Sequence, residues 1–472
     1  MAASSSSSSA TTEIKELSLE QKEAMSAYAA GKNIFLTGPG GSGKTELIKR
    51  MVAFSQAQGK KVQVCALTGC ASVLLNCHAK TVHSWAGIGL AAAPNEEIVK
   101  KINGNKYKKN NWTVPNILII DEISMMSLKL FDLLDLIGRR VRSSPGSSFG
   151  GLQLVFSGDF YQLPPVGNTP ETSAFCFESA NWKSTFPCII QLKTIFRQTD
   201  PQYTKILNQV RVGKLYKSSL ECLMTHVDKP LPATFKPTIL LPRRKDAELI
   251  NASEMAKLTS VGKTYKRLRA QESELATASS SNHNNKWKPK KIAEVVGNNT
   301  TEIQLENEYN FLVNNIIADE ELVLKIGAQV MCIANIDTGM EASGASDNNN
   351  NNIIVNGSQG IVVDFNGELP VILFNNGVKR IIGYHIWASE VHPSVGVKQI
   401  PLIHAWAITI HKSQGVTLDM AQIDAGSNIF ECGQTYVALS RVKSLAGLYL
   451  TALNPQKIRV NHKVQQFYAE YS

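Results

Sequence analysis

The sequence contains 472 residues, of which 43% are hydrophobic and 19% are charged, and its formal net charge is +10. This length exceeds what one hydrophobic core supports, so we expect about two to four domains, and the balance of apolar and charged residues excludes a disordered chain. No apolar run reaches the roughly 18 residues that a membrane-spanning helix needs, and the positive charge suggests a polyanionic partner.

The chain begins with Met1-Ala2-Ala3 and six serines. Because residues 1–16 contain no apolar segment, we predict a disordered tail there and neither a secretory nor an organelle signal. The eight cysteines form no C-x-x-C pair. This spacing favours buried free thiols in a reducing compartment over a zinc site.

Residues 38–45 form a glycine-rich loop that fits the pattern G-x-x-x-x-G-K-[ST] at every fixed position. Residues 33–37 before it predict a short buried strand, and residues 46–52 after it predict a helix. Glycines let several backbone N–H groups point at one phosphate, and the helix adds the positive end of its dipole. We therefore predict a nucleoside triphosphate site, against the alternative of a turn without a ligand. The predicted binding residues are Gly38, Gly40, Gly41, Ser42, Gly43, Lys44 and Thr45.

In this pattern Lys44 reaches the β- and γ-phosphates, and the Thr45 hydroxyl takes one position on Mg²⁺. Asp121 and Glu122 follow a second apolar strand at 116–120. The first acid is suited to hold Mg²⁺, and the second to orient or deprotonate the attacking water. A solvated turn is the alternative, which the upstream phosphate loop makes less attractive.

Gln162 lies in the segment that follows the strand at 152–156. Its amide is suited to donate to the γ-phosphate, and a proline-stiffened loop explains the segment equally well. Strand and helix patterns alternate over 31–195, which predicts a parallel sheet with helices on both faces. Short β-type runs between 328 and 374 predict a small β-rich module.

A series of motifs in one order resembles superfamily-one DNA helicases of the Pif-one type, within the RecD-like branch. The series covers roughly residues 18–450. Its members are residues 19–21, the phosphate loop, 66–69, 81–85, 121–122, 158–165, 196–198, 327–331 with 355–358, 410–417 and 434–441.

The resemblance implies an α/β fold with two RecA-like P-loop motor domains and small accessory insertions, one of them β-rich and barrel-like. We expect the first motor domain at 17–195, with a small insertion at about 88–114. We expect the second motor domain in two segments, 196–265 and 396–472. The accessory insertion, at 266–395, contains Ser-, Asn- and Lys-rich stretches at 276–291 and 346–352, where we expect loops or disorder.

The resemblance also implies roles for single residues. Gln21 would contact adenine. Arg197 and Arg441 would come from the second motor domain as arginine fingers, because a planar cation stabilises charge on the transferring phosphoryl group. A solvated or salt-bridging arginine is the alternative, and we favour Arg441 because its motif is longer. The residues around the phosphates would be Lys44, Thr45, Asp121, Glu122 and Gln162.

Six residues in these motifs suit the phosphates and stacked bases of single-stranded DNA. For Trp85 a core position is the alternative, and for His411 a structural role. Basic stretches at 100–112 and 286–291 are either solvated loops or DNA-contacting elements, and the second also fits a nuclear localisation signal. The six predicted DNA-binding residues are Thr68, His83, Trp85, His411, Lys412 and Thr417.

The resemblance implies an ATP-dependent DNA helicase that uses ATP and Mg²⁺, moves 5′→3′ on single-stranded DNA and unwinds duplex and forked DNA. We expect a monomer in the nucleus or another DNA-containing compartment, neither secreted nor in contact with a membrane. One alternative is an ATP-gated remodeller that binds single strands without separating them. The other is a scaffolding relative without hydrolysis, against which the complete set of acids, glutamine and arginines argues.

Overall fold

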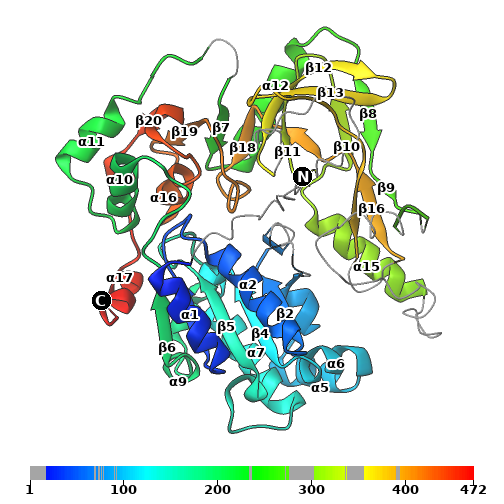
Figure 1. The fold of residues 1–472 in the computed structure, drawn as a ribbon, viewed down its shortest axis with the longest axis vertical. Coiled ribbons are helices and arrows are strands. Elements are labelled where there is room, and N and C mark those ends of the chain that lie inside the picture. Colours follow the sequence, from blue (N-terminus) through cyan, green and yellow to red (C-terminus); the bar gives the residue numbers. More distant parts are fainter. Residues whose placement is uncertain are drawn as a thin grey trace, which may run out of the picture.

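The computed structural model describes residues 17–471, apart from 69–70, 73–74, 76, 78, 90, 92, 233–235, 272, 276–301, 335, 337–353, 355 and 390–393. The described chain forms a first α/β domain, a second α/β domain and an accessory β-rich module (Figure 1). In Figure 1 the first domain lies at the bottom, and the other two units lie above it. The predicted disordered tail and both low-complexity stretches lie outside the described residues.

The first α/β domain is built on a six-stranded sheet in the order β3-β2-β4-β5-β1-β6. Every neighbouring pair in it is parallel. All residues of β1 and β4 are buried, as expected for apolar strands that are covered on both faces. The strands are β1 (Ile34–Thr37), β2 (Val62–Ala66), β3 (Lys80–Thr81), β4 (Ile117–Asp121), β5 (Gln153–Gly158) and β6 (Cys188–Gln191).

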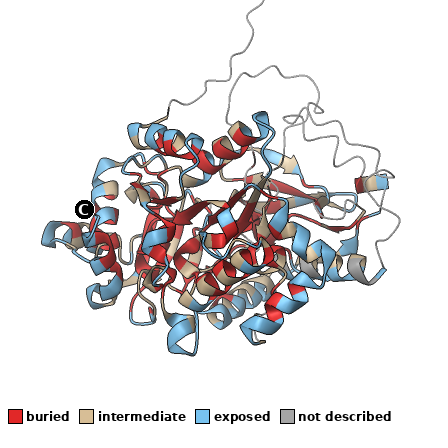
Figure 2. Ribbon diagram, turned by 90° about the horizontal axis from the view of Figure 1, so that it is seen from below, coloured by how far each residue is buried: buried red, intermediate tan, exposed pale blue. Residues whose placement is uncertain are grey.

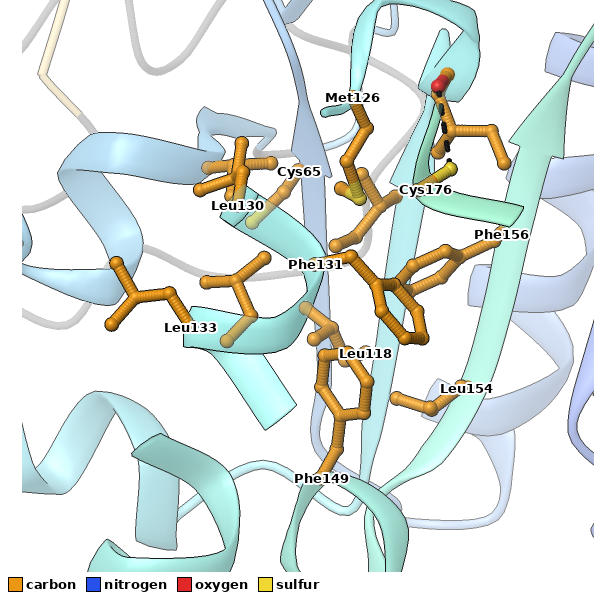
Figure 3. Close-up of a cluster of buried hydrophobic side chains, with 14 of the residues drawn as sticks. Cys65, Leu118, Met126, Leu130, Phe131, Leu133, Phe149, Leu154, Phe156 and Cys176 are labelled. Atoms are coloured by element: carbon orange, nitrogen blue, oxygen red, sulfur yellow. Dashed lines mark hydrogen bonds between the residues drawn. The ribbon is translucent and has the colours of Figure 1, made fainter. Parts of the chain in front are cut away.

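Helices cover both faces of this sheet, and alternate residues of β4 enter separate cores. Ile117 and Ile119 pack with α1 and α2, whereas Leu118 and Ile120 pack with α7. Figure 3 shows Phe131 of α7 lying against Leu118 and Phe156 in the second of these cores. The helices are α1 (Leu19–Ala29), α2 (Lys44–Ala57), α4 (Val82–Ala86), α5 (Asn95–Asn103), α6 (Lys106–Thr113), α7 (Leu128–Val141), α8 (Pro170–Ser173) and α9 (Trp182–Thr185).

The second α/β domain has a smaller parallel sheet in the order β18-β7-β19-β20. Its core joins these strands to α10 and α16, and Tyr203 of α10 donates its hydroxyl hydrogen to the Leu439 carbonyl of α16 at 2.7 Å. The elements are α10 (Pro201–Arg211), α11 (Lys217–Met224), β7 (Thr238–Leu241), α12 (Arg244–Lys257), β18 (Ala407–Thr409), β19 (Ala421–Ala425), α16 (Gln434–Leu439) and β20 (Leu448–Leu453).

The accessory module consists of antiparallel strands and α15 (Glu302–Asn315). Its sheets have the orders β14-β13-β12-β11-β17, β15-β16-β9 and β10-β8. Strand pairing therefore extends this module from 263 to 404, beyond the predicted range of 266–395. The strands are β8 (Lys263–Lys266), β9 (Leu268–Arg269), β10 (Glu321–Leu324), β11 (Gln329–Cys332), β12 (Gln359–Asn366), β13 (Leu369–Phe374), β14 (Lys379–Ile381), β15 (His385–Ala388), β16 (Gly396–Gln399) and β17 (Leu402–His404).

The last helix, α17 (His462–Ala469), packs on the first α/β domain, although we assigned its residues to the second. Val464, Phe467 and Tyr468 are buried in the core that contains α7. Their spacing places them on one face of the helix, so burial of that face against the first domain accounts for the difference. The chain therefore crosses between the two α/β domains once more than its sequence suggested.

Figure 2 shows how burial follows this architecture: the strands are buried and the outer faces of the helices are exposed. Among the helices that the structure describes, not one combines the length and the apolar character needed to cross a bilayer.

Candidate active site

The glycine-rich loop joins the end of β1 to the start of α2. Gly41 and Gly43 have φ angles of 83° and 81°, in the left-handed region that favours glycine. A Cβ atom on Gly41 would lie 2.5 Å from Arg197 Cβ, and one on Gly43 would lie 2.8 Å from Gln21 Nε2. Residues from outside the loop pack closely on it, and only glycine therefore fits at these two positions.

Buried Ser42 and half-buried Lys44 place polar groups in this loop. Lys44 Nζ donates to the carbonyl oxygens of Gly38 at 2.7 Å and Pro39 at 3.0 Å. Burial lowers the pKa of Lys44. The Ser42 hydroxyl is buried and has no hydrogen-bond partner among the described residues. A desolvated ammonium beside an unpaired hydroxyl and a curled backbone suits a multiply charged anion such as a triphosphate.

Asp121 and Glu122 stand at the end of β4, beside the start of α2. Thr45 Oγ1 donates to Asp121 Oδ2 at 3.5 Å, and the Glu122 N–H donates to Asp121 Oδ1 at 2.9 Å. Burial raises the pKa of both carboxyl groups, and the charge of Asp121 raises that of Glu122 further. Glu122 has a φ of 57°, a left-handed conformation that is uncommon outside glycine and is often found at functional sites.

The Thr45 hydroxyl and the Asp121 carboxylate present the hard oxygen ligands that Mg²⁺ takes. No group of three His, Cys, Asp or Glu side chains within the described ranges is placed to hold a metal ion. Mg²⁺ usually keeps several waters and binds through one or two protein ligands together with substrate phosphates. The residues at this position therefore fit a Mg²⁺ ion that is bound with a nucleotide.

Two arginines reach the phosphate loop at Gly40. A Cβ atom on Gly40 would lie 3.5 Å from Arg441 Nη2 and 3.6 Å from Arg197 Nη1. Arg441 follows α16 in the second α/β domain and is buried. Burial, together with repulsion from Arg197, lowers the pKa of Arg441 to about 9. Two desolvated cations beside this loop would be stabilised by an anion bound between them.

Arg197 lies on the segment between β6 and α10 that connects the two α/β domains. The predicted second motor domain, 196–265, includes this residue, whereas the structure places it in the connecting segment. Its neighbour Phe196 donates its backbone N–H to the Gly41 carbonyl at 2.8 Å, and Arg197 Nη1 donates to the Ser440 carbonyl at 3.2 Å. This linker therefore contacts the loop on one side and the second domain on the other.

Two residues of the second α/β domain contact the site although sequence reasoning gave them no role. Gln414 Nε2 donates to Glu122 Oε2 at 3.0 Å. The Tyr436 hydroxyl accepts a hydrogen bond from the Gly40 N–H at 2.9 Å. Both residues lie inside motifs quoted above, but their partners are hundreds of positions away in the chain. Only the approach of the two domains brings these groups together.

Gln162 lies in a buried segment between the two α/β domains. A Cβ atom on Gly433, at the start of α16, would lie 2.5 Å from the Gln162 carbonyl oxygen. Asp159 in the same segment accepts hydrogen bonds from Arg211 Nε and Nη2, both at 2.8 Å. Because Arg211 ends α10, this buried bidentate ion pair joins the two domains. No sequence pattern indicates this pair, because either residue alone resembles an ordinary charged residue.

Gln21 and Phe196 lie at the Gly43 side of the loop. Gln21 Oε1 accepts a hydrogen bond from the Ser18 N–H at 3.1 Å, and its Nε2 faces Gly43. The Phe196 ring would lie 3.4 Å from a Cβ atom on Gly43, and Phe196 is 44% exposed. An amide and an accessible aromatic ring on one side of a phosphate loop suit a purine base.

The prediction that Trp85 binds DNA was wrong, because its ring is buried in the core of the first α/β domain. Only 1% of Trp85 is exposed, and its ring centroid lies 4.6 Å from that of Trp112. The Trp112 indole N–H donates to the Ala86 carbonyl at 3.2 Å, which fixes the pair. The alternative of a core tryptophan therefore holds, and no base can stack on this ring.

The other five predicted DNA-binding residues lie at different depths. Lys412 is exposed, whereas Thr68, His83, His411 and Thr417 are half-buried. Burial lowers the pKa of both histidines, which favours their neutral forms. The His411 ring lies nearly parallel to that of Phe430, with centroids 6.5 Å apart, and Phe430 is half-exposed. These residues follow the carboxyl ends of strands or lie on the short helix α4.

The basic insertion at 100–112 folds as parts of α5 and α6. Lys108 Nζ donates to the Gly87 carbonyl at 3.1 Å, and exposed Lys101 pairs with Glu97 at 3.8 Å. These contacts favour the solvated explanation of the stretch. The second basic stretch, at 286–291, lies outside the described residues.

Comparisons with known proteins show which family this chain resembles. The family model described as "PIF1-like helicase" matches residues 16–219. The ATP-dependent DNA helicase PIF1 of Danio rerio is 33% identical over 481 residues, which span 96% of this chain and 64% of that protein. The crystal structure of Pif1 helicase from Candida albicans is 31% identical, with a TM-score of 0.71, and the match covers 97% of this chain and 100% of that one.

A third relative is the Pif1 helicase from Bacteroides, whose crystal structure is in complex with ADP-AlF3 and ssDNA. It is 27% identical to this chain, with a TM-score of 0.61 and 97% of each chain covered. The present chain thus spans somewhat less than two thirds of the Danio rerio relative, at 64% of its length, and nearly the whole of both solved structures.

Proposed function

The chain belongs to the PIF1-like helicase family and has its fold of two RecA-like α/β domains, and we propose on this premise that it is an ATP-dependent DNA helicase. The observation that carries the proposal is the convergence at Gly40. There the phosphate loop of the first domain meets Arg441 of the second domain and Arg197 of the connecting segment within 3.6 Å of one position. A site completed by two domains can couple hydrolysis to their relative movement.

The residues have distinct tasks in this proposal. Lys44 and the loop N–H groups bind the phosphates, and Thr45 and Asp121 would hold Mg²⁺, which neutralises charge on the β- and γ-phosphates when bound. Glu122 orients the attacking water and accepts its proton, and its bond from Gln414 fixes the carboxylate. The raised pKa of Glu122 makes it a stronger base than a solvated glutamate.

Arg441 and Arg197 stabilise the negative charge that develops on the transferring phosphoryl group. Gln162 lies in the segment between the domains, from which a change at the phosphates is passed on to the second domain. Gln21 hydrogen-bonds the adenine edge, and the exposed Phe196 ring lies where it can stack on the base. Loss of the terminal phosphate would then weaken the attraction between the domains and allow them to separate.

We infer that the DNA partner is a single strand, gripped by its backbone without reading sequence. The net charge of +10 supports this, and so does the ssDNA complex of the Bacteroides relative. Lys412, Thr68 and Thr417 are suited to contact phosphates, and the paired rings of His411 and Phe430 offer a surface for a base. We further propose movement in the 5′→3′ direction, action on forked DNA, a functional monomer and residence in a DNA-containing compartment such as the nucleus.

ATP hydrolysis, measured first without DNA and then with single-stranded DNA, tests the proposal. We expect DNA to stimulate hydrolysis, and we expect unwinding of duplexes with a 5′ overhang but not of those with a 3′ overhang. Hydrolysis that DNA does not stimulate would contradict a DNA motor. Stimulated hydrolysis without strand separation would favour a single-strand remodeller, and unwinding from a 3′ overhang alone would reverse the polarity.

A further inference from the structure

Tyr436 places a neutral hydroxyl of the second α/β domain on the phosphate loop of the first. The residue lies in α16, is buried, and accepts the Gly40 N–H at 2.9 Å. Burial, with the nearby charge of Asp159, raises the pKa of Tyr436 to about 12. The hydroxyl therefore stays protonated at neutral pH and acts at Gly40 as an uncharged acceptor.

The position of this bond within the loop is informative. Backbone N–H groups of a phosphate loop serve to bind phosphate oxygens. Gly40 is also the point that Arg441 and Arg197 approach, at 3.5 and 3.6 Å from its Cβ position. Because these arginines are the groups that would stabilise the transferring phosphoryl group, a phosphate bound near Gly40 would be the terminal one. The Tyr436 hydroxyl and an oxygen of that phosphate would thus require the same N–H.

We propose that Tyr436 is a positioning residue that senses the terminal phosphate: its hydroxyl holds the Gly40 N–H until a triphosphate displaces it, whereas a diphosphate leaves it in place. This inference rests on the proposed binding of ATP at the loop. It adds a role for a side chain that neither reacts nor carries charge.

The surroundings of Tyr436 explain how its displacement would be passed on. All six residues of α16 are buried, the last four of them in the core of the second α/β domain, and Arg441 follows two residues after that helix ends. Arg441 Nε also donates to the Val437 carbonyl of α16 at 2.8 Å. Gly433, at the start of the helix, packs on the Gln162 carbonyl. A shift of Tyr436 would therefore move Arg441 and press on the Gln162 segment at the same time.

Substitution Tyr436→Phe in the full chain tests the inference, since it keeps the ring and removes the hydroxyl. The affinities of a non-hydrolysable ATP analogue and of ADP are measured without DNA. We expect the variant to bind the triphosphate about two- to tenfold more tightly than the wild type, the range expected when one neutral hydrogen bond no longer competes. ADP affinity should stay unchanged, so the ratio of triphosphate affinity to ADP affinity should rise in the variant.

Tyr203→Phe is the matched control, because Tyr203 is also buried in the second domain but its hydroxyl donates to Leu439 and not to the loop. We expect this control to leave the ratio unchanged. An unchanged or lower ratio in Tyr436→Phe would overturn the inference, as would an equal rise in both variants. If the wild type binds the triphosphate and the variants give one of these outcomes, only the inference about Tyr436 is overturned. If the wild type binds neither nucleotide, the proposed function is overturned as well.

A second measurement covers the case in which Tyr436→Phe does not fold. Replacement of Tyr436 by 3-fluorotyrosine retains the ring and the hydroxyl, and its single ¹⁹F signal reports on the environment of that hydroxyl. We expect the signal to shift when the ATP analogue is added and to stay in place with ADP. A signal that does not shift with the ATP analogue, or that shifts equally with both nucleotides, would overturn the inference.

Discussion

The phosphate side and the DNA-facing side of this molecule differ in how their residues are held. On the phosphate side, polar and charged groups from both α/β domains are buried or half-buried and lie within hydrogen-bonding distance of one another, as Glu122 with Gln414 and Gly40 with Tyr436 illustrate. On the DNA-facing side, the predicted residues range from exposed Lys412 to fully buried Trp85. A phosphate requires converging donors at one point, whereas a single strand can be gripped over an extended groove.

This difference predicts unequal sensitivity to substitution. Removal of one group from a buried, convergent site leaves its partners uncompensated, and the loss is large. In a solvated groove, many other contacts remain after one group is removed, and salt already screens the interaction that is lost. The loss of affinity is therefore small. Substitutions on the two sides therefore test the comparison directly.

The largest effect is expected for Lys44→Ala on the phosphate side. Its half-buried ammonium donates to two carbonyl oxygens of the loop, and its loss removes the cation that reaches the β- and γ-phosphates. We expect ATP hydrolysis to fall by at least about a hundredfold, as when a single group that stabilises transition-state charge is removed. Steady-state hydrolysis in the presence of single-stranded DNA measures this, with Lys412→Ala as a control that keeps its maximal rate. Full turnover in Lys44→Ala would mean that the phosphate site is misassigned.

A large loss of stability is expected for Asp159→Asn, which leaves Arg211 buried beside a neutral amide. The pair is bidentate, with both contacts at 2.8 Å, and breaking a buried ion pair costs about 3–5 kcal/mol. Thermal unfolding followed by circular dichroism measures the effect as a lower Tm. The same change at Asp419, whose contact with Lys443 is exposed to solvent, should leave Tm nearly unchanged. Equal shifts in the two variants would remove the distinction between buried and exposed charges.

The smallest effects are expected on the DNA-facing side. Lys412→Ala should weaken binding to single-stranded DNA modestly and reduce the slope of log affinity against log salt concentration by about 0.7. Trp85→Phe should change neither quantity, because the Trp85 ring lies in the core and the substitution removes an indole N–H that has no partner among the described residues. Fluorescence anisotropy at several salt concentrations measures both. A loss of DNA affinity in Trp85→Phe at unchanged Tm would indicate that the Trp85 ring does contact DNA.

The sequence was most informative where neighbouring residues determine the geometry. The phosphate loop and the acids after β4 follow from local patterns, because glycine φ angles and the carboxyl end of a parallel strand are local properties. The spacing of Val464, Phe467 and Tyr468 likewise indicates a helix with one buried face, but such a face carries no information about which core covers it. The position of α17 on the first domain therefore had to come from the structure.

The same limit explains the errors at the site. Gln414 and Tyr436 act only because the second domain approaches the first, and Asp159 meets Arg211 only across the same boundary. Trp85 lies in a segment that we predicted to contact DNA, yet the side chain of one residue in such a segment can enter the core while its neighbours face outward. The motifs thus predicted which segments meet at the site better than they predicted which side chains make contacts there.

The central claim is that the second α/β domain completes the nucleotide site of the first through Arg441. The most direct test is the maximal rate of DNA-stimulated ATP hydrolysis in Arg441→Ala, measured together with ADP affinity. Because Arg441 lies beside Gly40 and forms no salt bridge with a carboxylate among the described residues, the main effect of its loss should be at the terminal phosphate. We predict a fall in kcat of about a thousandfold with ADP affinity within about twofold of the wild type. A kcat within about threefold of the wild type would contradict the account.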